Sequence, residues 1–166
     1  MRCVVAGPRE REFLKALLDY DLCSGCGRAI DEFPKVRLCF SPSTGRLRYV
    51  DDGAEPIMTV RASDMHVIPR RPLAEVLHRL LPYPRLRVVV VDEVAMDVAC
   101  SHTLFARHVL YLDPELRSGD EALLVDESDN LLGIATLRLG FHETMFFTRG
   151  PAGILRERVV SCEDQE

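Results

Sequence analysis

The sequence lacks several features that would place the protein in a membrane or give it a recognisable catalytic centre. No apolar run approaches the roughly 18–20 residues that a membrane-spanning helix needs, so no contact with a membrane is expected. The first residues, MRCVVAGPRER, become charged before a hydrophobic stretch develops, and no secretory signal peptide is expected. Glycine-rich phosphate loops and the GxSxG, HExxH and zinc-deaminase patterns are also missing. These absences predict a cytoplasmic protein, and no catalytic motif indicates an enzyme.

Lysine is scarce, because 19 of the 21 basic residues are arginine and only Lys15 and Lys35 are lysine. Arginine suits bidentate contacts with phosphates and base edges, although a GC-rich genome or a thermophilic host would enrich it equally. The net charge of −5 by itself argues against binding to nucleic acid. However, residues 1–87 hold 15 basic and 11 acidic residues (+4), whereas residues 88–166 hold 6 and 15 (−9). Halves of opposite charge indicate two modules.

The first half has the pattern of a small α+β domain. Apolar spacing predicts amphipathic helices over residues 9–20 and 72–81, the second with Pro72 in its first turn. Between the helices, alternating segments predict an antiparallel meander with a hairpin turn at Asp52-Gly53; these segments cover residues 36–41, 46–50 and 56–61. A Pro-Tyr-Pro segment follows the second helix, and we place the end of this domain at residue 84.

The second half predicts a small barrel, because short strand patterns recur at a spacing of about ten residues. The expected strands cover residues 87–91, 104–112, 121–126, 131–139 and 154–160, with a helix at 92–100 and a helical turn at 141–147. The fold class is therefore α+β. An N-terminal α/β meander domain (1–84) precedes a small mixed β-barrel (85–160) and an acidic tail (161–166).

Six cysteines are present, and without a secretion signal a disulfide framework is not expected. Only Cys23 and Cys26 stand at metal-ligand spacing, from which two thiolates can share a tetrahedral Zn²⁺. Such a site needs two further ligands, and no second pair of this spacing exists. Structural zinc, a redox pair and a plain turn all remain open for this segment, and the plain turn is favoured. No other cofactor is expected.

From Val88 onward the chain resembles a PUA domain, a small β-barrel that binds structured RNA. The motifs that carry this resemblance occur in the family's order. They are Val91-Asp92 before a small-residue helix, LFARHV (104–109), DPELRSGDE (113–121) leading into LVDE (124–127), LLGIA (131–135), and RGPA (149–152) before a strand that ends in Arg156.

The resemblance points in particular to the C-terminal part of archaeal tRNA-guanine transglycosylases and archaeosine-synthesis proteins. The segments TGRLRYV (44–50) and AEPIMTVRASD (54–64) look like the domain that precedes PUA in those proteins. The transglycosylase catalytic barrel is far larger than this chain. The resemblance therefore implies a non-catalytic RNA-binding protein that recognises tRNA or tRNA-like RNA, alone or as the partner of a tRNA-modifying enzyme.

In that family, RNA is held by the helix-to-strand segment after the first strand and by part of the last strand. The corresponding residues here are Ser101, His102, Thr103, Leu104, Phe105, Ala106 and Arg107, then Arg156, with Arg149 and Gly150 nearby. The family usually has glycine where Ser101 stands. Leu104 and Phe105 are equally suited to the barrel core, and Arg156 to a surface pair with Glu157 or Glu143.

Two further functions remain open from the sequence. One is a ribosome-biogenesis or translation factor that binds ribosomal RNA, and the other is a metal- or redox-active enzyme that uses Cys23 and Cys26. The stretch from Arg70 to Arg87 carries five arginines and one glutamate, and it is a candidate extension of the phosphate-binding surface. With such local positive charge, the acidic net charge no longer excludes RNA.

Overall fold

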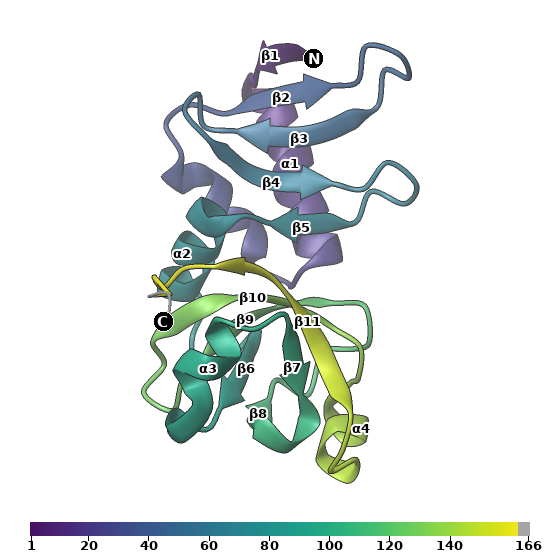
Figure 1. Ribbon diagram of the computed structural model, residues 1–166. Coiled ribbons are helices and arrows are strands. Elements are labelled where there is room, and N and C mark those ends of the chain that lie inside the picture. Colours follow the sequence, from purple (N-terminus) through teal and green to yellow (C-terminus); the bar gives the residue numbers. More distant parts are fainter. Residues whose placement is uncertain (163–166) are drawn as a thin grey trace. The chain divides into compact units, whose positions relative to one another are not determined.

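The computed structural model describes residues 1–162, and its chain divides into two compact units, Met1–Leu80 and Leu81–Glu166 (Figure 1). The sequence pattern places this boundary after residue 84 instead. Most of the expected acidic tail (161–166) lies outside the described residues. Within the described part, no helix is both long and apolar enough to cross a membrane.

The first unit contains a five-stranded antiparallel sheet in which each strand pairs with its sequence neighbour. The strands are β1 (Arg2–Val5), β2 (Arg37–Phe40), β3 (Leu47–Asp51), β4 (Pro56–Val60) and β5 (Val67–Pro69). The expected meander is thus present as β2, β3 and β4. The pattern missed β1 and β5, since a fully exposed four-residue strand and a three-residue strand are too short to show alternation.

Helix α1 (Pro8–Asp21) crosses one face of this sheet (Figure 1). Proline suits its first turn, and the Gly7 N–H donates to the Glu10 carboxylate at 3.0 Å, which caps the helix start. Leu14 and Leu18 are fully buried. The 3₁₀-helix η1 (Cys26–Glu32) and helix α2 (Arg71–Leu80) complete the unit.

The second unit is a curled six-stranded sheet in the order β7-β11-β10-β9-β6-β8 (Figure 1). Its strands are β6 (Arg87–Val90), β7 (Thr103–Phe105), β8 (Val109–Leu112), β9 (Glu121–Val125), β10 (Leu131–Leu137) and β11 (Pro151–Arg158). All pairs are antiparallel except β6 with β9. The sheet is therefore mixed, as expected.

Short helices connect these strands. They are η2 (Asp92–Val94), α3 (Ala95–Ala99), η3 (Ala106–His108) and α4 (Phe141–Phe146). The continuous strand expected over residues 104–112 is wrong, because η3 divides it into β7 and β8. This interruption turns the chain from one edge of the sheet to the other.

Arg87, the first residue of β6, has a buried guanidinium group. Arg87 is 1% exposed, and its Nη1 donates to the carbonyl oxygens of Leu81 at 3.1 Å and Arg85 at 2.8 Å. Its Nε lies 3.2 Å from the Asp129 carboxylate. Arginine can be buried in this way because its charge is paired and its N–H groups are hydrogen-bonded.

The expected phosphate-binding stretch over residues 70–87 is therefore only partly available. Arg87 is inside the fold and cannot reach RNA. Arg71 pairs with Glu75 at 2.8 Å, and Arg79 pairs with Glu32 at 3.1 Å. These exposed pairs reduce the free positive charge of the stretch.

An ion pair also joins β2 and β3 in the first unit. The Asp51 carboxylate is 7% exposed and accepts hydrogen bonds from Arg37 Nε at 2.7 Å and Arg37 Nη2 at 2.8 Å. These bonds hold the pKa of Asp51 below its ordinary value, although burial opposes them. Because the folded-state pKa is lowered, the pair stabilises the fold above the unfolded-state pKa and loses this effect as acid protonates the carboxylate.

Strands β10 and β11 approach each other too closely for a side chain at Gly153. A Cβ atom at this position would lie 2.8 Å from the Thr136 carbonyl oxygen, which is a backbone atom and cannot rotate away. Glycine is thus required where β11 runs between β10 and β7.

We predict that Gly153→Ala lowers the free energy of unfolding by about 1–3 kcal/mol, because the methyl group forces the two strands apart. Chemical denaturation measures this change. The control is Gly140→Ala, where a Cβ would lie 3.7 Å from its nearest neighbour at φ −79°, and we expect a loss below about 1 kcal/mol. Equal losses in both variants would contradict the steric explanation.

We predict that Asp51→Asn lowers the thermal unfolding temperature at pH 7 and flattens its decline below about pH 4, where unfolded aspartate takes up its proton. The same melts on Asp31→Asn are the control, since the Asp31 partner of Lys15 is 58% exposed and such pairs contribute little. An unchanged acid profile in Asp51→Asn would show that the pair is not responsible.

Candidate nucleic-acid interface

The two segments that the resemblance to PUA domains assigns to RNA lie side by side in the second unit. Strands β7 and β11 pair in antiparallel register, with Thr103 opposite Ile154 and Phe105 opposite Pro151. Backbone hydrogen bonds extend the contact at both ends, from Leu155 N to His102 O at 3.0 Å and from Ala106 N to Gly150 O at 3.0 Å. Residues 101–107 and 149–156 therefore form one continuous surface.

Two adjoining cavities open on this surface. The larger holds about 320 Å³ and is lined by Ser101, His102, Leu155, Arg156, Glu157 and Arg158. The smaller holds about 170 Å³ and is lined by Val94, Asp97, Val98, Ser101, Thr103, Phe105, Arg107 and His108. Ser101 lines both, so the two cavities adjoin at the turn that follows α3.

A chain of hydrogen bonds fixes Arg156 at the larger cavity. Its Nε donates to Thr136 Oγ1 at 2.7 Å, and the Thr136 hydroxyl donates in turn to Glu121 Oε2 at 2.7 Å. Glu121 is 2% exposed, so the carboxylate that ends the chain is inside the fold. Arg156 itself is exposed, and the surface pairs with Glu157 or Glu143 considered from the sequence are not formed in the described residues. Its terminal nitrogens are thus available for an anionic ligand.

Ser101, which stands where the resemblance expects glycine, fits into the turn. Ser101 Oγ lies 2.9 Å from Val98 O and 3.0 Å from Thr103 O, and it donates its one proton to either carbonyl. The side chain is half-buried and satisfied by the backbone. Serine therefore closes the turn after α3 without extending a polar group across the surface.

Phe105, Arg107 and His108 form a group of planar side chains beside the smaller cavity. The Arg107 guanidinium carbon lies 5.4 Å from the centre of the Phe105 ring, and the His108 ring meets that ring edge-on at 6.3 Å. Arg107 Nε also donates to His108 Nε2 at 3.3 Å. Exposed π faces next to a guanidinium are suited to stacking on unpaired bases.

The remaining residues predicted to contact RNA include both buried and exposed side chains. Leu104 and Ala106 are 0% and 4% exposed, so their side chains belong to the barrel core and only their backbones border the surface. Thr103 is half-buried, whereas His102 and Arg149 are exposed. Gly150 adopts φ +90°, a conformation that favours glycine, at the turn into β11.

Sequence reasoning missed Arg158 and His108 as lining residues. Arg158 follows Arg156 by two positions in β11. Side chains two positions apart in a strand point to the same face, so the sequence could have predicted that Arg158 lies beside Arg156. His108 follows Arg107 directly in the sequence, and that neighbourhood was its only signal, because η3 rather than a strand positions it.

The cysteines pair with one another, contrary to expectation. Disulfides join Cys3 to Cys39, Cys23 to Cys26, and Cys100 to Cys162. Folding brings the Cα atoms of the three pairs within 4.0, 5.3 and 5.8 Å, a proximity that spacing along the chain does not reveal for the first and third pairs. For Cys23 and Cys26, zinc binding stays a prediction for the reduced protein, since only thiolates bind the metal.

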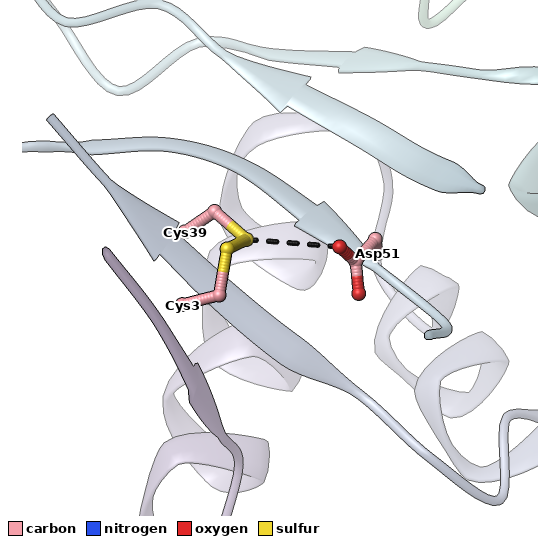
Figure 2. A group of neighbouring side chains, drawn as sticks. All are labelled: Cys3, Cys39 and Asp51. Carbon is pink, nitrogen blue, oxygen red and sulfur yellow. Dashed lines mark hydrogen bonds between the residues drawn. A yellow bond between two sulfur atoms is a disulfide. The ribbon is translucent and has the colours of Figure 1, made fainter. Parts of the chain in front are cut away.

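A second group of possible metal ligands lies in the first unit. Figure 2 shows Cys3, Cys39 and Asp51, whose ligand atoms all lie within 4.8 Å of one another. The two sulfurs are bonded to each other, and the carboxylate is held by Arg37. In this oxidised form the group is therefore a structural ion pair beside a disulfide, and it offers no thiolate to a metal.

Comparisons with known proteins match both units. Residues 12–84 match the family model of the patch-forming domain C2 of tRNA-guanine transglycosylase. The chain is 36% identical over 126 residues to the tRNA-guanine(15) transglycosylase of Methanococcus vannielii, and 34% identical over 140 residues to that of Pyrococcus furiosus. These matches cover 76% and 84% of the chain but only 19% and 23% of the relatives. The chain thus spans about a fifth of the length of these curated relatives.

Solved structures share the fold of nearly the whole chain. A hypothetical protein from Pyrococcus horikoshii has a TM-score of 0.69 at 16% identity, with 96% of both chains covered. A conserved PUA domain protein from Thermoplasma acidophilum has a TM-score of 0.63 at 15% identity, with 96% of this chain and 95% of that chain covered. The resemblance expected from the sequence is therefore confirmed: the chain is similar to the C-terminal, PUA-containing part of archaeal tRNA-guanine transglycosylases, and its barrel is a PUA fold.

Proposed function

We propose that this chain is a non-catalytic RNA-binding protein that recognises tRNA or a tRNA-like RNA through residues 101–107 and 149–158. The observation that carries the proposal is the pairing of β7 with β11, which sets Arg156 and Arg158 beside Ser101 and His102 around one cavity. The likeness of the chain to part of the tRNA-guanine(15) transglycosylases supports tRNA as the ligand.

The surface offers the two kinds of contact that structured RNA needs. Arg156 presents a positioned guanidinium to a phosphate, and the exposed backbone around Gly150 allows a sugar-phosphate chain to approach closely. Phe105 and Arg107 offer planar faces to a base. One end of the surface thus holds the phosphate chain, and the other holds an unstacked base.

An acidic group near the surface favours selectivity over bulk attraction. Asp97 is exposed and lines the smaller cavity. A carboxylate repels phosphate, but it accepts hydrogen bonds from the amino groups of bases. We therefore expect modest affinity for RNA of arbitrary sequence, with recognition by shape and by specific contacts.

The proposal includes a separate catalytic partner. The chain matches about a fifth of the length of the transglycosylases to which it is similar. We propose that it serves as an accessory to a tRNA-modifying enzyme of the transglycosylase type and holds the RNA while that enzyme acts.

We predict that Arg107→Ala combined with Arg156→Ala weakens binding to tRNA at least about tenfold at low salt and reduces the slope of log affinity against log salt by about one, because the phosphate contact of Arg156 and the base contact of Arg107 are both lost. Fluorescence anisotropy across a salt titration measures both quantities.

The matched control is Arg28→Ala combined with Arg48→Ala, which removes the same charge from exposed positions of the first unit. Its slope and affinity should remain close to those of the wild type. Identical curves for the wild type and the Arg107/Arg156 variant would reject this surface as the tRNA site. Tight binding to ribosomal RNA fragments without binding to tRNA would instead favour a ribosomal role.

A further inference from the structure

Three apolar side chains project from the end of α4. Phe146 is 81% exposed, Phe147 is 50% exposed and Met145 is 43% exposed. The two phenyl rings lie 5.6 Å apart and nearly perpendicular, at 88°. A contiguous apolar cluster of this kind on a polar surface marks an interaction site.

Folding does not require this cluster, because other residues hold α4 in place. Thr144 is 4% exposed, and the Phe141 ring packs edge-on against Tyr111 at 6.1 Å. The helix start is capped by Glu143, whose carboxylate accepts the Gly140 N–H at 3.0 Å. Phe146 and Phe147 are therefore left free to contact a ligand.

The cluster adjoins the proposed RNA surface. Arg149 follows Phe147 by two residues, and the next carbonyl, that of Gly150, accepts the Ala106 N–H at 3.0 Å. Three residues of extended chain span at most about 10 Å, so the Cα atom of Phe147 lies within that distance of the Gly150 Cα atom. Phe105, itself 39% exposed, lies in β7 opposite Pro151.

We propose that Phe146 and Phe147 form a platform on which unpaired nucleotides stack, next to the duplex or folded part of the RNA that residues 101–107 and 149–158 hold. This inference rests on the proposed function and names the RNA more closely as one with a single-stranded segment beside a helix. Bases present π faces that stack on phenyl rings. The exposed cation of Arg149 supplies a contact for the phosphate that links two such bases. The exposed cation of Arg149, two residues after Phe147, favours a ligand that carries phosphates over an uncharged apolar partner.

The test compares two RNAs, a hairpin with a single-stranded extension carrying 2-aminopurine and the same hairpin with a blunt end. Wild type should bind the extended RNA more tightly and quench its fluorescence. Phe146→Ser combined with Phe147→Ser should lose about tenfold or more in affinity for the extended RNA, lose the quenching, and bind the blunt RNA as the wild type does. Tyr20→Ser removes an aromatic ring that is 92% exposed in the first unit and should change nothing.

The outcomes separate this inference from the proposed function. If wild type binds neither RNA, the proposed function fails and this inference fails with it. If wild type binds both RNAs but the phenylalanine variant behaves identically, the platform is overturned and the proposed function stands. Equal weakening on both RNAs also overturns it, as does a concentration-dependent dimer in light scattering that the variant abolishes, which would assign the rings to a second copy. Unchanged thermal melts show that the variant is folded.

Discussion

The antiparallel pairing of β7 with β11 is the constraint on which the candidate RNA surface depends. It joins the segment after α3 to β11, and these two segments are about fifty residues apart in sequence. Gly153 allows β11 to lie close to β10 on its other side, and the Thr136 hydroxyl on β10 then holds Arg156. The close approach of β11 to β10 and the position of the Arg156 side chain thus depend on each other.

Arginine has two physical roles in this chain, and burial distinguishes them. Arg87 is enclosed, and its charge is paired with Asp129 while its N–H groups bind carbonyls, so it stabilises the start of the barrel. Arg107 and Arg156 are exposed, and each uses Nε to bind a neighbouring side chain. An acidic protein can therefore present local positive charge on one part of its surface. The net charge of −5 is a sum over the whole chain and does not describe the charge at any one part of its surface.

The sequence predicts much of the fold, because its strands and helices carry clear periods and its PUA motifs occur in order. The meander and the segments of the barrel follow from these signals. It does not predict properties that depend on proximity in three dimensions. The pairing of Cys3 with Cys39, the burial of Arg87 and the inward position of Leu104 each need the folded neighbour. For the candidate site, the sequence supplies the two segments, and the structure shows which side chains face outward.

Hydrogen–deuterium exchange of the chain with and without tRNA tests the central claim most directly, because it reports where RNA covers the backbone. The account predicts slower exchange at residues 101–107 and 149–158 when tRNA is bound, with little change over the five strands of the first unit. Binding that protects only the first unit, and leaves β7 and β11 exchanging as in the free protein, would contradict it.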